Sequence, residues 1–178
     1  IFMGEVDQNG PSAPLIPSVS EYLKAIAGKT AALFALATYT GATIGQLDFT
    51  EKKAAYRFGR QLGMAFQMID DLLDYTQTTA TLNKPVLEDL HNGIVTLPLI
   101  YAYQNVPEQL APMVGTAAKI AANSDRIAAI VSEHGLPQAR QLATRYTDKA
   151  INALAPLPDA RIKQELRKLT QQLLQRDH

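Results

Sequence analysis

The hydrophobic and polar positions of the chain repeat with the period of an α-helix over most of its length. The clearest case is the segment from Gly63 to Asp74, in which apolar side chains fall in one stripe and polar side chains in another at about 100° per residue. No segment shows the period of two that indicates a strand, and the chain has no internal repeat. The pattern therefore predicts an all-α fold.

Capping and breaking residues divide this pattern into successive helices. Ser18 and Glu21 have the spacing of a capping box and begin a long helix that ends at Gly41 or Gly45. Thr50 is the expected N-cap of the helix that carries the central segment and ends near residue 75. The other expected elements are the end of a helix at residues 1–8, loops at 9–17 and 76–83, and helices at 86–91 (stop at Gly93), after Thr96 with Pro98 in the first turn, and at 107–122, 125–134 (stop at Gly135), 137–155 and 159–176.

Length and composition favour a single globular domain. The chain has 178 residues, of which 47% are hydrophobic and 19% charged. Seventeen basic residues balance seventeen acidic ones, so no overall field favours nucleic acid. The chain has no cysteine, no recognisable signal peptide and no apolar run long enough to span a membrane. These features favour a cytoplasmic protein without disulfides.

The polar stripe of the central segment carries three carboxylates, Asp70, Asp71 and Asp74. They are neighbours on a helix and repel one another, and no lysine lies between them. Oxygen ligands on a partly solvated face suit Mg²⁺. One turn before Asp71, Gln67 supplies a neutral hydrogen-bond donor, and Gly63 leaves room one turn earlier. A solvated acidic face is the simpler explanation of a bare D-D-x-x-D motif, whereas these neighbours favour a Mg²⁺ site.

Four motifs in register resemble one protein family. The segment from Gly63 to Asp74 reads G-x-x-F-Q-x-x-D-D-x-x-D, and Lys84 is followed by D-x-x-x-G-x-x-T-x-P. Upstream lie the pair Lys29-Thr30 and a G-E-x-x-Q motif that begins at Gly4. Together they resemble the second aspartate-rich region of the trans-polyprenyl diphosphate synthases, in particular those of medium or long product length such as hexaprenyl and heptaprenyl diphosphate synthases.

The resemblance implies an isoprenoid synthase helical bundle and a Mg²⁺-dependent prenyltransferase that condenses isopentenyl diphosphate with an allylic diphosphate. In such an enzyme the aspartates serve Mg²⁺, the lysines hold the diphosphate, and the neutral polar residues bond beside them. The residues concerned are Asp70, Asp71 and Asp74 for the metal, Lys29 and Lys84 for the diphosphate, and Thr30 and Gln67 as hydrogen-bonding neighbours. The resemblance also implies a homodimer, or a heterodimer with another synthase subunit.

The chain departs from the family pattern because it contains no first aspartate-rich motif. Residues 1–178 are therefore expected to be the C-terminal portion of a single synthase domain, incomplete for catalysis alone. Two alternatives stay open: a related terpene cyclase with the same fold and metal chemistry, and a non-catalytic partner subunit of a heteromeric synthase. Tyr22 is interpreted first as core packing and second as part of a cavity wall for a prenyl chain. Asp89 suits a local cap or pair as well as a metal ion.

Overall fold

The computed structural model describes residues 16–76 and 87–175 of the chain. Every regular element within these residues is helical and none is a strand, which confirms the all-α prediction. The helix end expected at residues 1–8, and most of the two expected loops, lie outside the described residues. The elements are α2 (Val19–Ile26), the π-helix η1 (Ala27–Ala31), α3 (Ala32–Ile44), α4 (Phe49–Thr76), α6 (Glu88–His91), α7 (Leu97–Asn105), α8 (Pro107–Leu110), α9 (Ala117–Ala122), α10 (Ser124–His134), α11 (Leu136–Ala153) and α12 (Ala160–Gln175).

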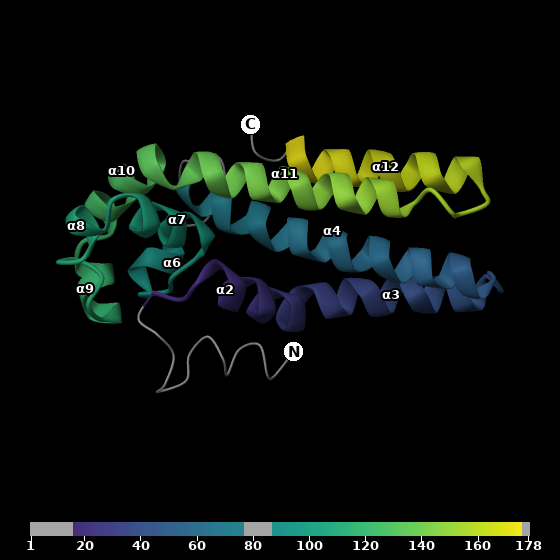
Figure 1. The fold of residues 1–178 in the computed structure, drawn as a ribbon, viewed down its shortest axis with the longest axis horizontal. Helices are drawn as coiled ribbons and strands as arrows, with labels where there is room; N and C mark the ends of the chain where they lie inside the picture. Colours follow the sequence, from purple (N-terminus) through teal and green to yellow (C-terminus); the bar gives the residue numbers. More distant parts are fainter. Residues whose placement is uncertain (1–15, 77–86, 176–178) are drawn as a thin grey trace.

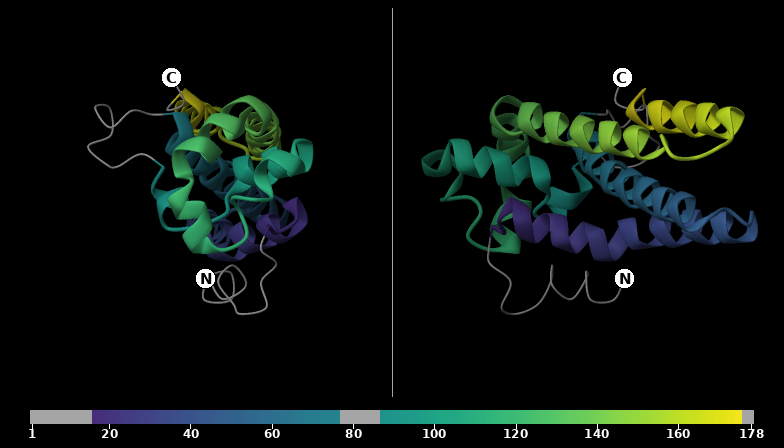
Figure 2. Two further views of the ribbon diagram at one scale, coloured as in Figure 1. Left: turned by 90° about the vertical axis from the view of Figure 1, so that its left-hand side faces the viewer. Right: turned by 45° about the vertical axis from the view of Figure 1, so that its right-hand side comes forward.

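The long helix α4 organises an elongated bundle (Figure 1). It packs against α3 on one side and against α11 on the other, and both run antiparallel to it. Helix α12 returns along α11, as the rotated views in Figure 2 also show. The short helices α6 to α10 gather where α4 ends. The C-terminal end of α4, which carries the three aspartates, therefore lies where the long helices meet the short ones.

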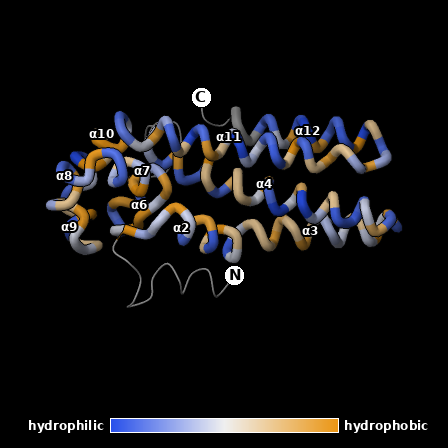
Figure 3. The backbone as a smooth tube through the Cα atoms, in the orientation of Figure 1, coloured by the Kyte–Doolittle hydropathy of each residue, from blue (hydrophilic) through white to orange (hydrophobic). Residues whose placement is uncertain are grey.

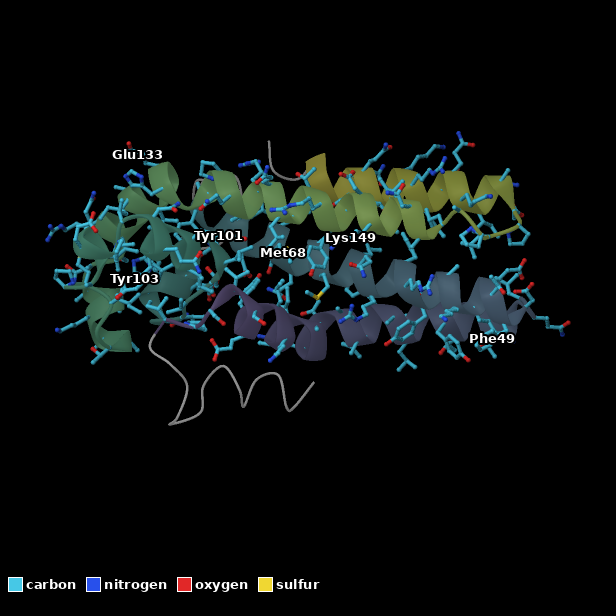
Figure 4. The ribbon with its side chains drawn as sticks, viewed as in Figure 1. Phe49, Met68, Tyr101, Tyr103, Glu133 and Lys149 are labelled. Carbon is cyan, nitrogen blue, oxygen red and sulfur yellow. The ribbon has the colours of Figure 1, made fainter. Side chains whose placement is uncertain are left out.

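The core consists of three clusters of buried side chains that follow the bundle from end to end. The cluster nearest the aspartates joins α2, η1, α4, α7 and α11 and includes Met68, which is fully buried and labelled in Figure 4. A second cluster lies among α6 to α10, and a third between α3, α4 and α11. Figure 3 shows that α3 is apolar along most of its length, whereas α12 is mostly hydrophilic.

Helices α3 and α4 approach closely because α4 carries two glycines in successive turns. A Cβ atom on Gly63 would lie 2.7 Å from the Cα of Ala31, in η1. A Cβ on Gly59 would overlap the carbonyl oxygen of Phe34 and the hydroxyl of Thr38. Both glycines are buried, so no larger side chain fits without moving the backbone of the facing helix.

Several expected helix boundaries are confirmed. Ser18 and Glu21 form the capping box, with bonds of 3.2 Å from the Glu21 N–H to the Ser18 hydroxyl and 2.7 Å from the Ser18 N–H to the Glu21 carboxylate. Gly45, the second of the two expected stops, follows the last residue of α3, and Gly135 follows the last residue of α10. Gly93 adopts a left-handed φ of 71° after α6, a conformation that glycine tolerates best.

Two expected boundaries are wrong. Helix α4 is capped by Asp48 rather than Thr50: the Asp48 carboxylate accepts the Glu51 N–H at 2.8 Å, and Glu51 accepts the Asp48 N–H at 2.7 Å. Asp48 is the N-cap because Glu51 lies three residues later and completes a capping box with it. The helix expected at 107–122 is two helices, because Thr116 caps a new helix through the Lys119 N–H at 3.2 Å.

Two further features qualify the prediction. The π-helix η1 interrupts the long helix that was expected to run from Ser18 without a break. Thr96 is the N-cap of α7, as expected, but its side chain makes no capping hydrogen bond. Within the described part of the chain, no helix is both long and apolar enough to cross a membrane.

Candidate functional site

The three aspartates of α4 lie in three different environments. Asp70 is exposed, Asp74 is half-buried, and Asp71 is only 4% exposed. Asp71 differs from Asp70 because adjacent helix positions point about 100° apart, so one faces the core and the other faces solvent. Of the three carboxylates, Asp70 is thus the one most open to a ligand from solution.

Asp71 is held by hydrogen bonds from two different elements. Its Oδ2 accepts the hydroxyl of Tyr22, on α2, at 2.6 Å. Its Oδ1 accepts the Nε2 of Gln67, one turn earlier on α4, at 2.9 Å. The Oε1 of Gln67 in turn accepts the hydroxyl of Thr30, in η1, at 2.8 Å. The structure therefore brings the predicted residues Thr30, Gln67 and Asp71 into one continuous network.

The π-helix η1 and Gly63 place Thr30 for this bond. A π-helix adds a residue to a turn, and such turns often occur at functional sites. Ala31 packs directly on Gly63, and Gln67 lies one turn beyond Gly63 on the same face of α4. Thr30, next to Ala31, consequently reaches Gln67. Lys29 belongs to the same five-residue π-helix, and its charge acts on the carboxyl of Asp89.

Burial sets the protonation behaviour of the two hydrogen-bonded groups. Burial raises the pKa of Asp71 from 3.8 to about 7, although the bonds from Tyr22 and Gln67 favour the ionised form. Burial, together with the charge of Asp71, raises the pKa of the Tyr22 hydroxyl well above its ordinary value. Tyr22 therefore remains a protonated donor throughout the physiological pH range.

Asp89, on α6, belongs to the same electrostatic cluster. Its burial and the negative charges of Asp74 and Asp70 raise its pKa to about 6, while the ammonium of Lys29 lowers it. Four charged groups from α4, α6 and η1 thus act on one another at this end of the bundle. The sequence favours no single role for Asp89, and its place in the D-x-x-x-G-x-x-T-x-P motif is the signal that points to the site.

Asp74 links α4 to α6. Its Oδ1 accepts the backbone N–H of Glu88 at 2.9 Å, and its Oδ2 accepts that of Asp89 at 3.2 Å. Its carbonyl oxygen also accepts the N–H of Leu87 at 3.1 Å. These bonds satisfy amide groups at the start of α6 that the helix itself leaves unpaired. Asp74 therefore fixes Asp89 relative to the α4 carboxylates.

The remaining predicted residue, Lys84, lies outside the described residues. Among residues 16–76 and 87–175, no three side chains of the His, Cys, Asp and Glu types converge closely enough to form a metal-binding group. The hydrogen bond from Tyr22 to Asp71 was not predicted from the sequence. Tyr22 and Asp71 are 49 residues apart, and no local pattern connects them.

This arrangement combines two kinds of group that bind phosphate-containing ligands. Carboxylate oxygens suit a hard divalent cation that keeps part of its hydration shell, and Asp70 offers such oxygens to solvent. The ammonium of Lys29 can attract an anion directly. The site is therefore suited to a ligand that is anionic and binds together with a metal ion.

Comparison with known proteins identifies the family. The family model for polyprenyl synthetase matches residues 1–134 of the chain. The chain therefore belongs to the polyprenyl synthetase family, and its helical fold is that of the polyprenyl synthases of known structure.

Three similar proteins illustrate this relationship. The chain is 36% identical over 161 residues to a probable mitochondrial hexaprenyl pyrophosphate synthase of Neurospora crassa, a match covering 90% of this chain and 36% of that protein. It is 34% identical over 179 residues to heptaprenyl diphosphate synthase component 2 of Geobacillus stearothermophilus, covering 100% and 56%. It superimposes on the crystal structure of a polyprenyl synthase from Caulobacter crescentus with a TM-score of 0.87 and 34% identity, covering 99% and 56%. The chain thus spans between about a third and somewhat more than half of the length of these relatives.

Proposed function

We propose that this chain takes part in a prenyltransferase reaction in which isopentenyl diphosphate is condensed with an allylic diphosphate to give a polyprenyl diphosphate. Membership of the polyprenyl synthetase family supports the reaction class. The observation that carries the proposal is the network from Thr30 through Gln67 to Asp71. This network joins the Lys-Thr pair and the aspartate motif into one site. Thr30 and Gln67, which bond to each other, are 37 residues apart in the sequence.

We propose that Asp70, Asp71 and Asp74 form the acidic wall that takes Mg²⁺. The donor set fits this ion because it consists of carboxylate oxygens. Burial and, after it, the negative charges of Asp74 and Asp70 raise the pKa of nearby Asp89, so a cation would relieve part of this repulsion. Mg²⁺ bound there would offset the negative charge that builds up on a departing diphosphate. The polyprenyl synthase from Caulobacter crescentus was crystallised in complex with calcium and isoprenyl diphosphate, which supports the binding of a divalent cation and a diphosphate by this chain.

The chain's other polar residues would have separate tasks in this site. Lys29 and Lys84 would hold the diphosphate oxygens through their ammonium groups. Thr30 would fix the orientation of the Gln67 amide, because its hydroxyl donates a hydrogen bond to Oε1 at 2.8 Å. Gln67 would then present its N–H to Asp71 and hold that carboxylate in place.

Metal binding tests this proposal directly. Mn²⁺, which replaces Mg²⁺ and is detected by electron paramagnetic resonance when free, would be titrated into the chain with inorganic pyrophosphate. Asp70→Ala is expected to weaken binding by about tenfold or more, because it removes a charged oxygen ligand. The matched control is Asp148→Ala, at an exposed aspartate of α11. Equal affinities of the Asp70→Ala and Asp148→Ala variants would refute the assignment.

Product analysis tests the reaction itself. The chain would be incubated with Mg²⁺, an allylic diphosphate and isopentenyl diphosphate, and the products identified by mass spectrometry. Elongated prenyl diphosphates would support the proposed reaction and would give the product length. Metal and pyrophosphate binding without any product would indicate that this chain needs further residues or another subunit to complete the cavity.

Assembly with a second subunit, identical or different, is a related proposal. The Geobacillus relative is named as one component of its synthase. Exposed apolar side chains gather on α3 and at the start of α4, where Leu36 is 61%, Ile44 77% and Phe49 79% exposed. Phe49 projects at the far end of the bundle in Figure 4. Surfaces of this kind are typically covered in an assembly. Light scattering after size-exclusion chromatography would measure the mass, and a monomer at all concentrations would contradict self-association.

The relatives reported above are named as prenyl diphosphate synthases, so no observation favours the terpene cyclase alternative. Cytoplasmic localisation stays a prediction, because the Neurospora relative is named as mitochondrial.

A further inference from the structure

Tyr22, on α2, is a buried side chain that bonds to the aspartate motif of α4. It is 2% exposed, and its ring belongs to the core cluster shared by α2, α4, α7 and α11. Its hydroxyl donates to the Oδ2 of Asp71 at 2.6 Å, which is a short hydrogen bond between a hydroxyl and a carboxyl group. The ring therefore packs as expected, and the hydroxyl has a separate partner.

The two bonds to Asp71 go to different oxygens of its carboxylate. Gln67 holds Oδ1 from the same helix, so this bond does not tie the carboxylate to a second element. Tyr22 holds Oδ2 from another element and so fixes the plane of the carboxylate relative to the bundle. Each oxygen keeps one lone pair for a further ligand.

We propose that Tyr22 is a positioning residue of the aspartate site: its hydroxyl orients the Asp71 carboxylate toward a divalent cation bound at the motif. This inference rests on the proposed function, because it concerns the same metal site. Residues that hydrogen-bond to a metal ligand fix its orientation, and removing one such partner lowers metal affinity by about 10- to 100-fold. Tyr22 would act only through Asp71 and would touch neither metal nor substrate.

The matched control for Tyr22 is Tyr75. It is a second tyrosine with a buried hydroxyl, at the same end of α4, and that hydroxyl does not donate to a carboxylate. Tyr22→Phe and Tyr75→Phe both remove one buried oxygen and keep an aromatic ring in the core. They differ in whether the lost oxygen holds Asp71. A difference between them therefore reports the hydrogen bond and not the loss of a buried hydroxyl.

The experiment is the Mn²⁺ titration with inorganic pyrophosphate on the full chain. Tyr22→Phe is expected to bind Mn²⁺ about 10- to 100-fold more weakly than the unchanged chain. Tyr75→Phe is expected to stay within about twofold. Rescue provides a readout that a purely structural role would not move: 4-aminophenylalanine at position 22 keeps a donor at the same place and should restore most of the affinity, whereas 4-methylphenylalanine should not. This pair also decides the matter if Tyr22→Phe fails to fold.

The possible results separate this inference from the proposed function. If Asp70→Ala loses Mn²⁺ while Tyr22→Phe binds as tightly as the unchanged chain, the role of Tyr22 is overturned and the metal site stands. Equal losses in Tyr22→Phe and Tyr75→Phe, or equal affinities of the amino and methyl analogues, also overturn it. If the unchanged chain does not bind Mn²⁺, the proposed metal site and the role of Tyr22 fall together.

Discussion

Replacing Gly63 by alanine tests how the close approach of η1 to α4 builds the site. The added Cβ would lie 2.7 Å from the Cα of Ala31 and 3.1 Å from the Cβ of Phe34. The first distance is 0.7 Å short of the 3.4 Å at which ordinary contact begins. Because the atom met is a backbone Cα, no rotation of a side chain can relieve the overlap, and η1 must move away from α4.

The net cost follows from two opposing effects. Overpacking a core that cannot yield costs up to about 3 kcal/mol. Alanine is better than glycine inside a helix by about 1 kcal/mol, which offsets part of this cost. We therefore expect Gly63→Ala to lower the free energy of unfolding by about 2 kcal/mol. In a chain of this size the corresponding fall in Tm is about 4–8 °C.

The matched control is Gly41→Ala, in the exposed part of α3. A Cβ on Gly41 would meet nothing within 4 Å, so only the helix preference acts, and stability should rise by about 0.5–1 kcal/mol. Thermal and urea unfolding, followed by circular dichroism, would measure both changes. A Gly63→Ala variant as stable as Gly41→Ala would refute the packing argument. Because Thr30 adjoins Ala31, Gly63→Ala should also weaken Mn²⁺ binding, whereas Gly41→Ala should not.

Three further predictions concern the caps and the buried carboxyl. Asp48→Ala should lower the free energy of unfolding by about 1 kcal/mol, measured by urea unfolding, while Thr50→Ala should change it by less than about 0.5 kcal/mol. Asp74→Ala should speed hydrogen exchange at the Glu88 amide, since that amide loses its acceptor, and an unchanged rate would contradict the bond at 2.9 Å. The pKa of Asp71 is about 7 in the folded chain, against an ordinary value of 3.8. Between these two pH values the folded chain holds a proton that the unfolded chain has released. The contribution of this carboxyl to stability is therefore present at low pH and is lost as the pH rises from about 4 to about 7. Urea unfolding across this range should show a flatter decline in Asp71→Asn than in the unchanged chain, and parallel declines would refute the assignment.

The sequence determined the helices because the signals that begin and end them are local. The capping box of Ser18 with Glu21 and the stops at Gly45 and Gly135 depend on residues within one turn of the boundary. The expected N-cap Thr50 is wrong although the correct signal is also local, since Asp48 and Glu51 have the spacing of a capping box and bond to each other. The aspartate motif was likewise predictable, since its spacing lies within a single helix.

The tertiary structure decided what surrounds each aspartate. Nothing in the motif distinguishes exposed Asp70 from Asp71, which is 4% exposed, because burial depends on which neighbouring helix covers each position. The bonds from Thr30 and Tyr22 join residues 37 and 49 positions apart and require α2 and η1 to pack closely on α4. That packing arises from glycines and core side chains spread along several helices, whose combined effect no local pattern records.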